Sequence, residues 1–391
     1  MKTARLSELS VDGKGIYGIA ASAVERRDDL YTYLRITDIC DDGTLNRSVL
    51  KSVDAPGAAN YLLKPNDIVF ARTGGSTGRN YFYDGSDGEF VYAGFLIKFS
   101  LDPQRVNPKF IKYYCQSEQY KNWVRSFNTG STRGNINAQT FGNMEIPLPE
   151  RLQQDYLVDV LSPIDNKIKV NQQINDNLFA QMQALYKAWF VDYEPFGGAK
   201  PATWESSDIY SLANIIYGAP FASKQFNTEG NGKPIIRIRD LKDQHFATYT
   251  TEEHPKGYLL QAGDIVVGMD GEFRPYIWGN DEAWLNQRVC VFENKRPYGK
   301  AFLYCTIKPL LYAIEQTQVA TTVIHIGKKD FDAFEVIMPD NDMMDRFDTI
   351  TTPMIHQIVA NCFENKRMTA MRDVLLPKLM SGEIDVSDIQ L

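Results

Sequence analysis

The feature that most constrains this chain is an internal repeat, because the second half of its 391 residues resembles the first at an offset near 200 residues. Tyr17-Gly18 recurs as Tyr217-Gly218, and residues 34–39 recur as residues 236–241. The matches keep their order while their offsets drift, as expected when loops differ in length between two copies of one domain. Further matches pair residues 63–69 with 260–266, Asn107-Pro108 with Lys308-Pro309, and Thr132, Ile136, Phe141 and Pro149 with Thr322, Ile326, Phe331 and Pro339.

Each copy ends in a segment with helical periodicity. Ser162-Pro163 and Thr352-Pro353 each place a hydroxyl residue before proline, which is typical of a helix start, and we expect a short helix before each one. Apolar residues then follow at alternating steps of four and three, which predicts a heptad seam. The seam positions are Ile164, Ile168, Asn171, Asn175, Leu178, Met182, Leu185 and Trp189 in the first copy, and Met354, Ile358, Asn361, Asn365, Met368, Arg372, Leu375 and Leu379 in the second.

Two asparagines recur in each seam, at Asn171 and Asn175 and at Asn361 and Asn365. A buried asparagine weakens a seam but penalises wrong registers more, so the four residues are candidates for setting how two helices align. The alternative is that they face solvent. A helix from Pro163 to Phe190 would span about 40 Å, close to one turn of B-DNA.

Composition limits the classes of function. The N-terminus is too polar for a signal peptide and no apolar run is long enough to cross a membrane, so we expect a soluble, cytoplasmic protein. Five cysteines stand singly with only four histidines, so the sequence predicts neither a metal site nor disulfides.

The net charge of −7 argues against a simple DNA-coating protein, but the charge is unevenly distributed. Residues 105–135 carry six positive side chains against Glu118, and residues 284–308 carry five against Glu293. These two basic islands are either nucleic-acid contacts or fluctuations on a solvated surface.

Loops that combine glycine, small polar residues and arginine can approach phosphates while a side chain reaches a base edge. Residues 72–80 and 128–137 form two such loops in the first copy, and residues 268–274 and 320–325 are their counterparts in the second. Residues 286–288 add another polar cluster in the second copy. Each residue could equally be an ordinary exposed turn residue. The candidate DNA-binding residues are Arg72, Thr77, Arg79, Asn80, Arg125, Thr132, Arg133, Asn135, Asn137, Asp270, Arg274, Gln287, Arg288, Thr321, Thr322 and His325.

No catalytic motif is visible. The spacing Gly13-x-Gly15-x-x-Gly18 matches a dinucleotide-binding loop, but it lacks the buried strand before it and the helix after it that such a loop needs. Asp67 and Asp264 each precede an apolar triplet and are best explained as turn residues that open buried strands. The sequence therefore predicts no catalytic residues.

The combination resembles a known family, the specificity subunits of Type I restriction-modification systems. The resemblance is closest in Ile146-Pro147-Leu148-Pro149, in residues 161–175, and in Ala184-Leu185-Tyr186-Lys187-Ala188-Trp189-Phe190-Val191-Asp192, and it extends to residues 375–384. It implies a mixed α/β protein with a pseudo-twofold repeat, in which two target recognition domains are separated by two long antiparallel coiled-coil helices. The boundaries we predict are 1–149 and 193–339 for these domains, and 150–192 and 340–391 for the helical regions.

The resemblance also implies the partners. These are double-stranded DNA with a bipartite, gapped site, two methyltransferase subunits, and restriction subunits. S-adenosylmethionine and ATP with Mg²⁺ would be carried by those subunits, with no cofactor on this chain.

Two other functions fit parts of the sequence. A coiled-coil scaffold with protein- or sugar-binding ends shares the repeat and the helices, but leaves the arginine-containing loops unexplained. A stand-alone DNA methyltransferase would need a cofactor pocket that the sequence does not offer.

Overall fold

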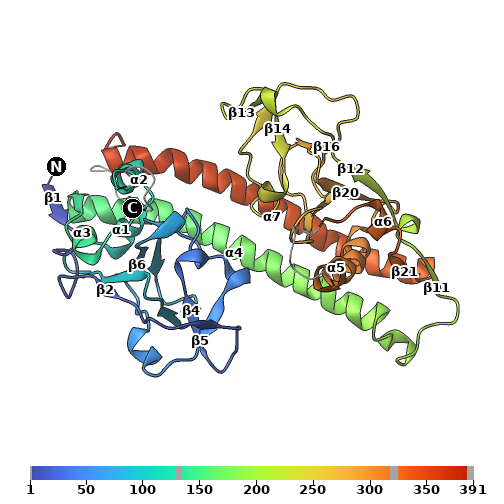
Figure 1. Ribbon diagram of the computed structural model, residues 1–391, viewed down its shortest axis with the longest axis horizontal. Coiled ribbons are helices and arrows are strands. Elements are labelled where there is room, and N and C mark those ends of the chain that lie inside the picture. The colour runs from blue at the N-terminus through green and yellow to red at the C-terminus, as the bar shows by residue number, and fades with distance from the viewer. Residues whose placement is uncertain (1, 128–133, 318–324, 385–391) are drawn as a thin grey trace. The chain divides into compact units, whose positions relative to one another are not determined.

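The computed structural model describes residues 2–127, 134–317 and 325–384. Its contacts divide the chain into two compact units, residues 1–165 with 370–391 and residues 166–369. The division falls inside both long helices, α4 (Arg151–Phe190) and α7 (Asn341–Ser381), which are labelled in Figure 1. We call residues 1–192 the first copy and residues 193–391 the second copy of the repeat.

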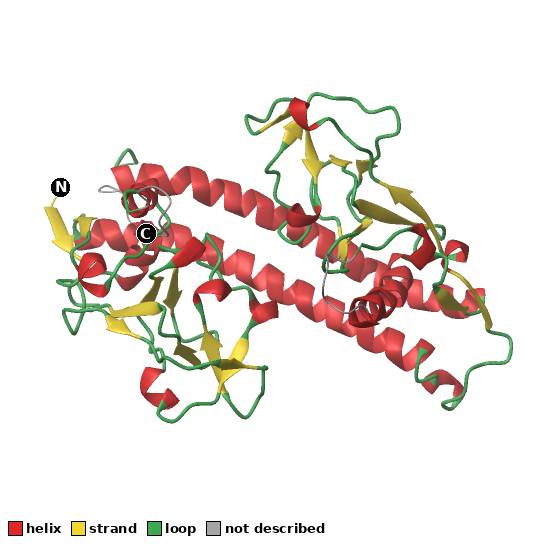
Figure 2. Cartoon of the chain, viewed as in Figure 1, coloured by secondary structure: helices red, strands yellow, loops and turns green. Residues whose placement is uncertain are grey.

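The first unit combines small sheets with helices (Figure 2). Its strands are β1 (Lys2–Arg5), β2 (Ile16–Tyr17), β3 (Ala23–Val24), β4 (Tyr31–Leu34), β5 (Lys51–Val53), β6 (Asp67–Ala71), β7 (Asn80–Tyr83), β8 (Phe90–Tyr92), β9 (Leu96–Ser100) and β10 (Glu145–Leu148). Its helices before α4 are α1 (Pro108–Tyr114), α2 (Glu118–Arg125) and α3 (Ala138–Gly142), and its 3-10 helices are η1 (Ile36–Asp38), η2 (Arg47–Val49), η3 (Ala58–Tyr61) and η4 (Gly74–Ser76).

The second unit has the same kinds of element. Its strands are β11 (Glu205–Asp208), β12 (Ala213–Tyr217), β13 (Phe226–Asn227), β14 (Lys233–Ile236), β15 (Tyr249–Thr250), β16 (Leu259–Leu260), β17 (Ile265–Gly268), β18 (Pro275–Ile277), β19 (Ala283–Leu285), β20 (Val289–Asn294) and β21 (Glu335–Met338). Its helices are α5 (Lys300–Thr317) and α6 (Lys328–Phe331), and its 3-10 helices are η5 (Glu194–Phe196), η6 (Ile209–Ser211), η7 (Ser223–Gln225) and η8 (Ile238–Asp240).

The sheet topology confirms the internal repeat. The order β2-β9-β6-β7 in the first copy corresponds to β12-β20-β17-β18 in the second, and β3-β5-β4-β8 corresponds to β13-β15-β14-β19. Among the described strands, β4 pairs with β8 and β14 pairs with β19 in parallel, at equivalent places in the two copies. Gly18 and Gly218 recur because a Cβ there would lie 2.2 Å from the Tyr92 carbonyl oxygen and 1.9 Å from that of Asn286. Gly18 is followed by β3 and not by a helix, which agrees with rejecting the dinucleotide-binding loop.

The recurring aspartates close local turns, as expected. The Asp67 carboxylate accepts from the Lys64 backbone N–H at 2.8 Å, and Asp264 accepts from that of Gln261 at the same distance. The next residues of both strands are buried, so each aspartate ends a turn where a buried strand begins.

The predicted helix starts at Ser162-Pro163 and Thr352-Pro353 are wrong. Both prolines lie inside continuous helices of 40 and 41 residues, which at 1.5 Å per residue are each about 60 Å long. The preceding hydroxyls do not cap a helix, since Ser162 Oγ lies 3.3 Å from the Tyr113 hydroxyl oxygen and Thr352 donates to the Tyr298 carbonyl.

Burial on both sides of each proline explains why the helices continue. Leu161 and Ile164 flank Pro163 and are buried, as are Thr351 and Ile355 around Pro353. This packing outweighs the loss of one backbone hydrogen bond at each proline.

The match of Asn107-Pro108 with Lys308-Pro309 is also wrong. Pro108 is the first residue of α1, with the Asn107 side chain accepting from the Lys109 N–H, whereas Pro309 lies in the interior of α5. An offset of 190 instead aligns Tyr114-Cys115 with Tyr304-Cys305, which are buried in both copies. The two dipeptides share only a proline and do not occupy equivalent positions in the repeat.

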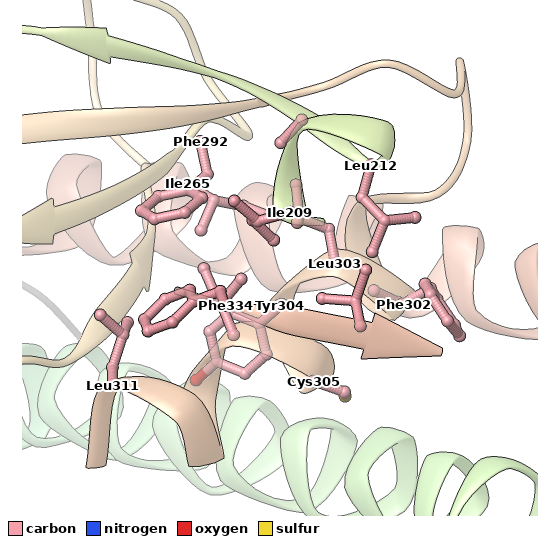
Figure 3. Packing of buried hydrophobic residues seen from close by; sticks show 14 of the residues in the cluster. Ile209, Leu212, Ile265, Phe292, Phe302, Leu303, Tyr304, Cys305, Leu311 and Phe334 are labelled. Atoms are coloured by element: carbon pink, nitrogen blue, oxygen red, sulfur yellow. The ribbon is translucent and has the colours of Figure 1, made fainter. Parts of the chain in front are cut away.

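A large apolar core fills the second unit. Figure 3 shows Ile209, Leu212, Ile265, Phe292 and Phe334 packed with residues of α5, and the same cluster includes Met182 of α4 and Ile355 and Ile358 of α7. The two long helices therefore pack against the sheet domain of this unit as well as against each other.

The predicted heptad seam is confirmed, since none of its positions is exposed. Asn171 and Asn361 are 1% and 3% exposed, so the solvent-facing alternative is wrong for these two, and Asn175 and Asn365 are half-buried. The Asn171 amide donates to Asn365 at 2.9 Å and the Asn361 amide donates to Asn175 at 2.8 Å. The later residue of α4, Asn175, pairs with the earlier residue of α7, Asn361, so α4 and α7 run antiparallel within the second unit.

Candidate nucleic-acid interface

In each copy, the residues that follow a central strand, β6 or β17, meet the residues that precede a short helix, α3 or α6. In the first copy Thr73 forms an antiparallel bridge with Asn135, and the Ile136 N–H donates to the Arg72 carbonyl at 2.9 Å. In the second copy Asp270 bridges His325, and the Ile326 N–H donates to the Met269 carbonyl, also at 2.9 Å. The same backbone frame therefore presents different side chains in the two copies.

The first-copy cluster is centred on Arg72. Its guanidinium lies over the Tyr17 ring, 5.0 Å from the centroid, and Nη2 makes a long 3.5 Å contact with the Asn135 side-chain oxygen. Arg72 Nε is buried and has no hydrogen-bond partner among the residues that the structure describes. A guanidinium carries five N–H donors, so Arg72 has further donors that a base or a phosphate could use.

The second-copy cluster consists of Asp270, Arg288 and His325. The Asp270 carboxylate lies 2.7 Å from His325 Nδ1 and 3.5 Å from Arg288 Nη1. Because a carboxylate only accepts, we place a proton on His325 Nδ1, which then donates to Asp270. Arg288 Nη1 lies 2.9 Å from the same nitrogen and cannot donate to it in this tautomer. Arg288 keeps donors available for a base or a phosphate.

The tyrosine beside Arg72 has an equivalent in the second copy. Tyr17 accepts from the Ala138 N–H at 3.1 Å, and the equivalent Tyr217 packs beside the Phe331 ring. Burial raises the pKa of Tyr217 to about 12, so its hydroxyl stays protonated and able to donate. Sequence reasoning did not include these tyrosines as candidates, although their recurrence beside glycine was a signal.

Several candidates already have structural partners. The Thr77 hydroxyl donates to the Gly74 and Gly134 carbonyls, the buried Asn80 amide donates to the Cys115 carbonyl, and the Asn137 side chain caps α3. Three arginines are paired with acidic residues: Arg79 with Asp41, Arg274 with Glu315, and Arg125 with Glu118. Gln287 is exposed and its backbone N–H donates to the Ala219 carbonyl. The structure thus brings together Arg72 and Asn135, and separately Asp270, Arg288 and His325.

Four candidates, Thr132, Arg133, Thr321 and Thr322, lie outside the described residues. They belong to segments that lead into Asn135 and His325, so their chemistry remains a prediction from the sequence.

The basic islands are less free than their composition indicates. Lys112 pairs with Asp165, and Arg296 pairs with Asp345 and Asp348. Lys308 donates to the side chain of Gln183. Much of this positive charge stabilises packing between elements, so the clusters around Arg72 and Arg288 are better interface candidates than the islands as a whole.

No group of histidine, cysteine, aspartate and glutamate suited to a metal ion occurs in residues 2–127, 134–317 and 325–384. Across the same residues, no helix has the length and apolar character needed to cross a membrane.

Comparison with known proteins places the chain in a family. The Type I restriction modification DNA specificity domain matches residues 31–179 and 201–358, which together make up most of the chain. The chain is 22% identical over 444 residues to the specificity subunit of the Type I restriction enzyme HindI from Haemophilus influenzae, covering 92% of this chain and 97% of that protein. It is 38% identical over 128 residues to the EcoBI specificity subunit from Escherichia coli, covering 32% of this chain and 27% of that protein.

A solved structure agrees with the fold. The S subunit of a Type I restriction-modification system from M. genitalium superposes with a TM-score of 0.51 at 17% identity, over 97% of this chain and 95% of that one. With two matches to the domain, one in each copy of the repeat, the chain belongs to the family of Type I restriction-modification specificity subunits, the non-catalytic subunits that recognise the DNA target site.

Proposed function

We propose that this specificity subunit recognises a bipartite, gapped DNA site, with one half-site read by each copy of the repeat. The observation that carries the proposal is the pair of equivalent clusters, Arg72 with Asn135 and Asp270 with Arg288 and His325. Arginine can pair bidentately with guanine and asparagine with adenine, so equal frames with different side chains would read different half-sites.

The asparagine pairs between α4 and α7 would fix the register of the helices. The repeat relates the two hydrogen-bonded pairs, because an offset of 190 residues maps Asn171 onto Asn361 and Asn175 onto Asn365. The pair of Asn171 with Asn365 is therefore equivalent to the pair of Asn361 with Asn175. A shift by one heptad would leave buried amides without partners, at a cost of about 1–3 kcal/mol for each. The gap length would therefore be a fixed property of this chain.

Membership of the family implies DNA, methyltransferase and restriction subunits as partners. We infer a complex with two methyltransferase subunits, one for each copy, and S-adenosylmethionine and ATP with Mg²⁺ on the partner subunits. The net charge of −7 and the paired arginines favour weak DNA binding by the isolated chain, with a steep salt dependence. Tight specific binding without a partner would contradict this part of the proposal.

The test is methylome sequencing of a strain with and without this gene, supplied together with its neighbouring methyltransferase gene. We expect adenine methylation at one gapped, two-part motif that disappears when the gene is absent. An unchanged pattern in a strain with demonstrably active methylation would reject the proposal and return attention to the coiled-coil scaffold.

Exchange of the copies assigns each half-site. A chimaera in which another specificity subunit supplies the residues equivalent to 193–339 should keep one half of the motif and change the other. A change in both halves would mean that the two copies read DNA jointly.

A further inference from the structure

A four-residue turn that leads into β9 in the first copy has an equivalent that leads into β20 in the second. The Leu96 N–H donates to the Ala93 carbonyl, as that of Val289 donates to Asn286. The Gly94 N–H donates to the Ile19 carbonyl, as that of Gln287 donates to Ala219. Phe95 and Arg288 therefore occupy the same position in the two copies.

That position adjoins the candidate interface in both copies. The Phe95 carbonyl accepts from the Arg72 N–H at 3.0 Å, and the Arg288 carbonyl accepts from the Met269 N–H at 2.8 Å. The next residue after each donor, Thr73 or Asp270, bridges the segment that carries Asn135 or His325. The turn thus adds a third segment to each cluster.

The two side chains are both exposed but differ in chemistry. Phe95 is 59% exposed, although a phenylalanine ring in water loses the free energy that burial would provide, about 2 kcal/mol. The Arg288 side chain is 54% exposed, and its φ of 73° is an uncommon left-handed conformation for a residue other than glycine. Packing within the chain does not explain the exposed Phe95 ring, and the Arg288 side chain contacts Asp270 at 3.5 Å while more than half of it remains exposed.

We propose that positions 95 and 288 determine one base pair each, in the half-sites read by the first and second copies. Phe95 would make an apolar contact with the 5-methyl group of a thymine in the major groove, and Arg288 would donate to O6 and N7 of a guanine. This inference rests on the proposed division of the DNA site between the copies. It predicts an A·T pair at the position read by residue 95 and a G·C pair at the position read by residue 288.

The test uses the complex reconstituted with its methyltransferase partner and a set of duplexes that carry single base-pair substitutions across the motif. Phe95→Ala should reduce discrimination at one A·T pair of one half-site, and Arg288→Ala should reduce discrimination at one G·C pair of the other. Each loss should be about five-fold or more in relative affinity, because a good base contact contributes that much discrimination. Both residues are exposed, and equal melting temperatures would show that the variants are folded.

Matched controls separate a base contact from a general surface effect. Val11 is an apolar residue with 61% exposure whose N–H donates to the Ser100 carbonyl, at the opposite end of β9 from Phe95. Arg346 is an exposed arginine on α7 that pairs with Asp342. Val11→Ala and Arg346→Ala should leave discrimination at every base pair unchanged.

Three outcomes would overturn the inference: unchanged discrimination in Phe95→Ala and Arg288→Ala, an equal loss of affinity for all duplexes, or effects of both variants in the same half-site. In each of these outcomes a bipartite motif for the wild-type complex would still leave the proposed function standing. If the wild-type complex shows no bipartite motif, the proposed function fails together with the inference.

Discussion

The two junctions between the long helices and the sheet domains occupy equivalent positions in the repeat, yet one is built from charges and the other from apolar side chains. In the first unit Asp165 lies 2.5 Å from Lys112 and 3.5 Å from Arg372. The Tyr113 hydroxyl also donates to Asp165, at 3.0 Å. This aspartate accepts from three side chains that come from α1 and α7.

At an offset of 190 residues, the second unit replaces every member of this network with an apolar residue. Phe302, Leu303 and Ile355 stand where Lys112, Tyr113 and Asp165 stand in the first, and Met182 takes the place of Arg372. All four belong to one buried cluster, and Figure 3 shows Phe302 and Leu303 within it.

The difference gives each junction its own partners. If the ends of α4 and α7 exchanged places, Arg372 would enter the apolar cluster and Met182 would face Asp165. An uncompensated buried charge costs several kcal/mol, so such an arrangement is strongly disfavoured. The repeat keeps one architecture while the side chains specify which helix segment packs on which copy.

Introducing a charge into the apolar junction should have the largest effect. Met182 is fully buried, so Met182→Arg would place an unpaired guanidinium among Phe302, Leu303 and Ile355. We expect the free energy of unfolding to fall by about 4 kcal/mol or more. Chemical denaturation of the chain in complex with its methyltransferase partner measures this loss.

Ile174→Arg is the matched control, because this residue of the same helix is 40% exposed and an arginine there remains in water. Its effect should stay below about 1 kcal/mol. Equal losses in the two variants would show that the junction does not discriminate between apolar and charged side chains.

The converse change, Arg372→Met, should have a smaller effect. It leaves Asp165 with Lys112 and the Tyr113 hydroxyl, so the carboxylate keeps a partner. We expect a loss of about 2 kcal/mol, and we expect Asp165→Ile to cost less in this variant than in the wild type, because one of its three partners is already absent. A double-mutant cycle between these positions measures the coupling, and additive effects would contradict the network.

The repeat and the heptad seam could be predicted from the sequence because both depend on spacing alone. The prolines could not be interpreted in this way. Pro163 and Pro353 match the local pattern of a helix start, and the burial of Leu161 and Thr351 before them, which favours a continuous helix, is not visible in the sequence. Local propensity was outweighed by tertiary packing.

The candidate site was predicted less completely, for a related reason. Arg72 and Arg79 lie in one loop and look alike in sequence, but Arg79 pairs with Asp41 while Arg72 Nε has no hydrogen-bond partner among the described residues. Phe95 was missed because its equivalence to Arg288 appears only in backbone hydrogen bonds. The residues next to a side chain in the sequence do not indicate which distant residues it contacts in the fold.

The two turn aspartates, Asp67 and Asp264, show the same contrast, because among the described residues only the one in the first copy has a charged partner on the neighbouring strand. Asp67 accepts from the Ser100 hydroxyl at 2.6 Å and pairs with Lys98 at 3.3 Å. An offset of 193 places Val291 where Lys98 stands, and Asp264 accepts instead from the Tyr258 hydroxyl at 3.0 Å. Burial raises the pKa of Asp264 above its usual value of 3.8, although its hydrogen bonds oppose this shift.

The smallest expected effect is therefore the pH dependence of Asp264→Asn. A raised pKa in the folded state means that this carboxyl contributes most to stability below pH 3.8, and that its contribution is lost as the pH rises through the folded-state pKa. The asparagine is neutral at every pH and can still accept from Gln261. The variant should match the wild type in acid and become up to about 1 kcal/mol more stable than it towards neutral pH.

Asp67→Asn should behave in the opposite way, because it removes the partner of the nearly buried Lys98. We expect it to destabilise the protein by about 2 kcal/mol at neutral pH. Free energies of unfolding measured from pH 4 to pH 7 for the wild type and both variants make the comparison. A loss of stability in Asp264→Asn that grows with pH would mean that the second copy also depends on a charged turn, and the contrast would then be confined to the helix junctions.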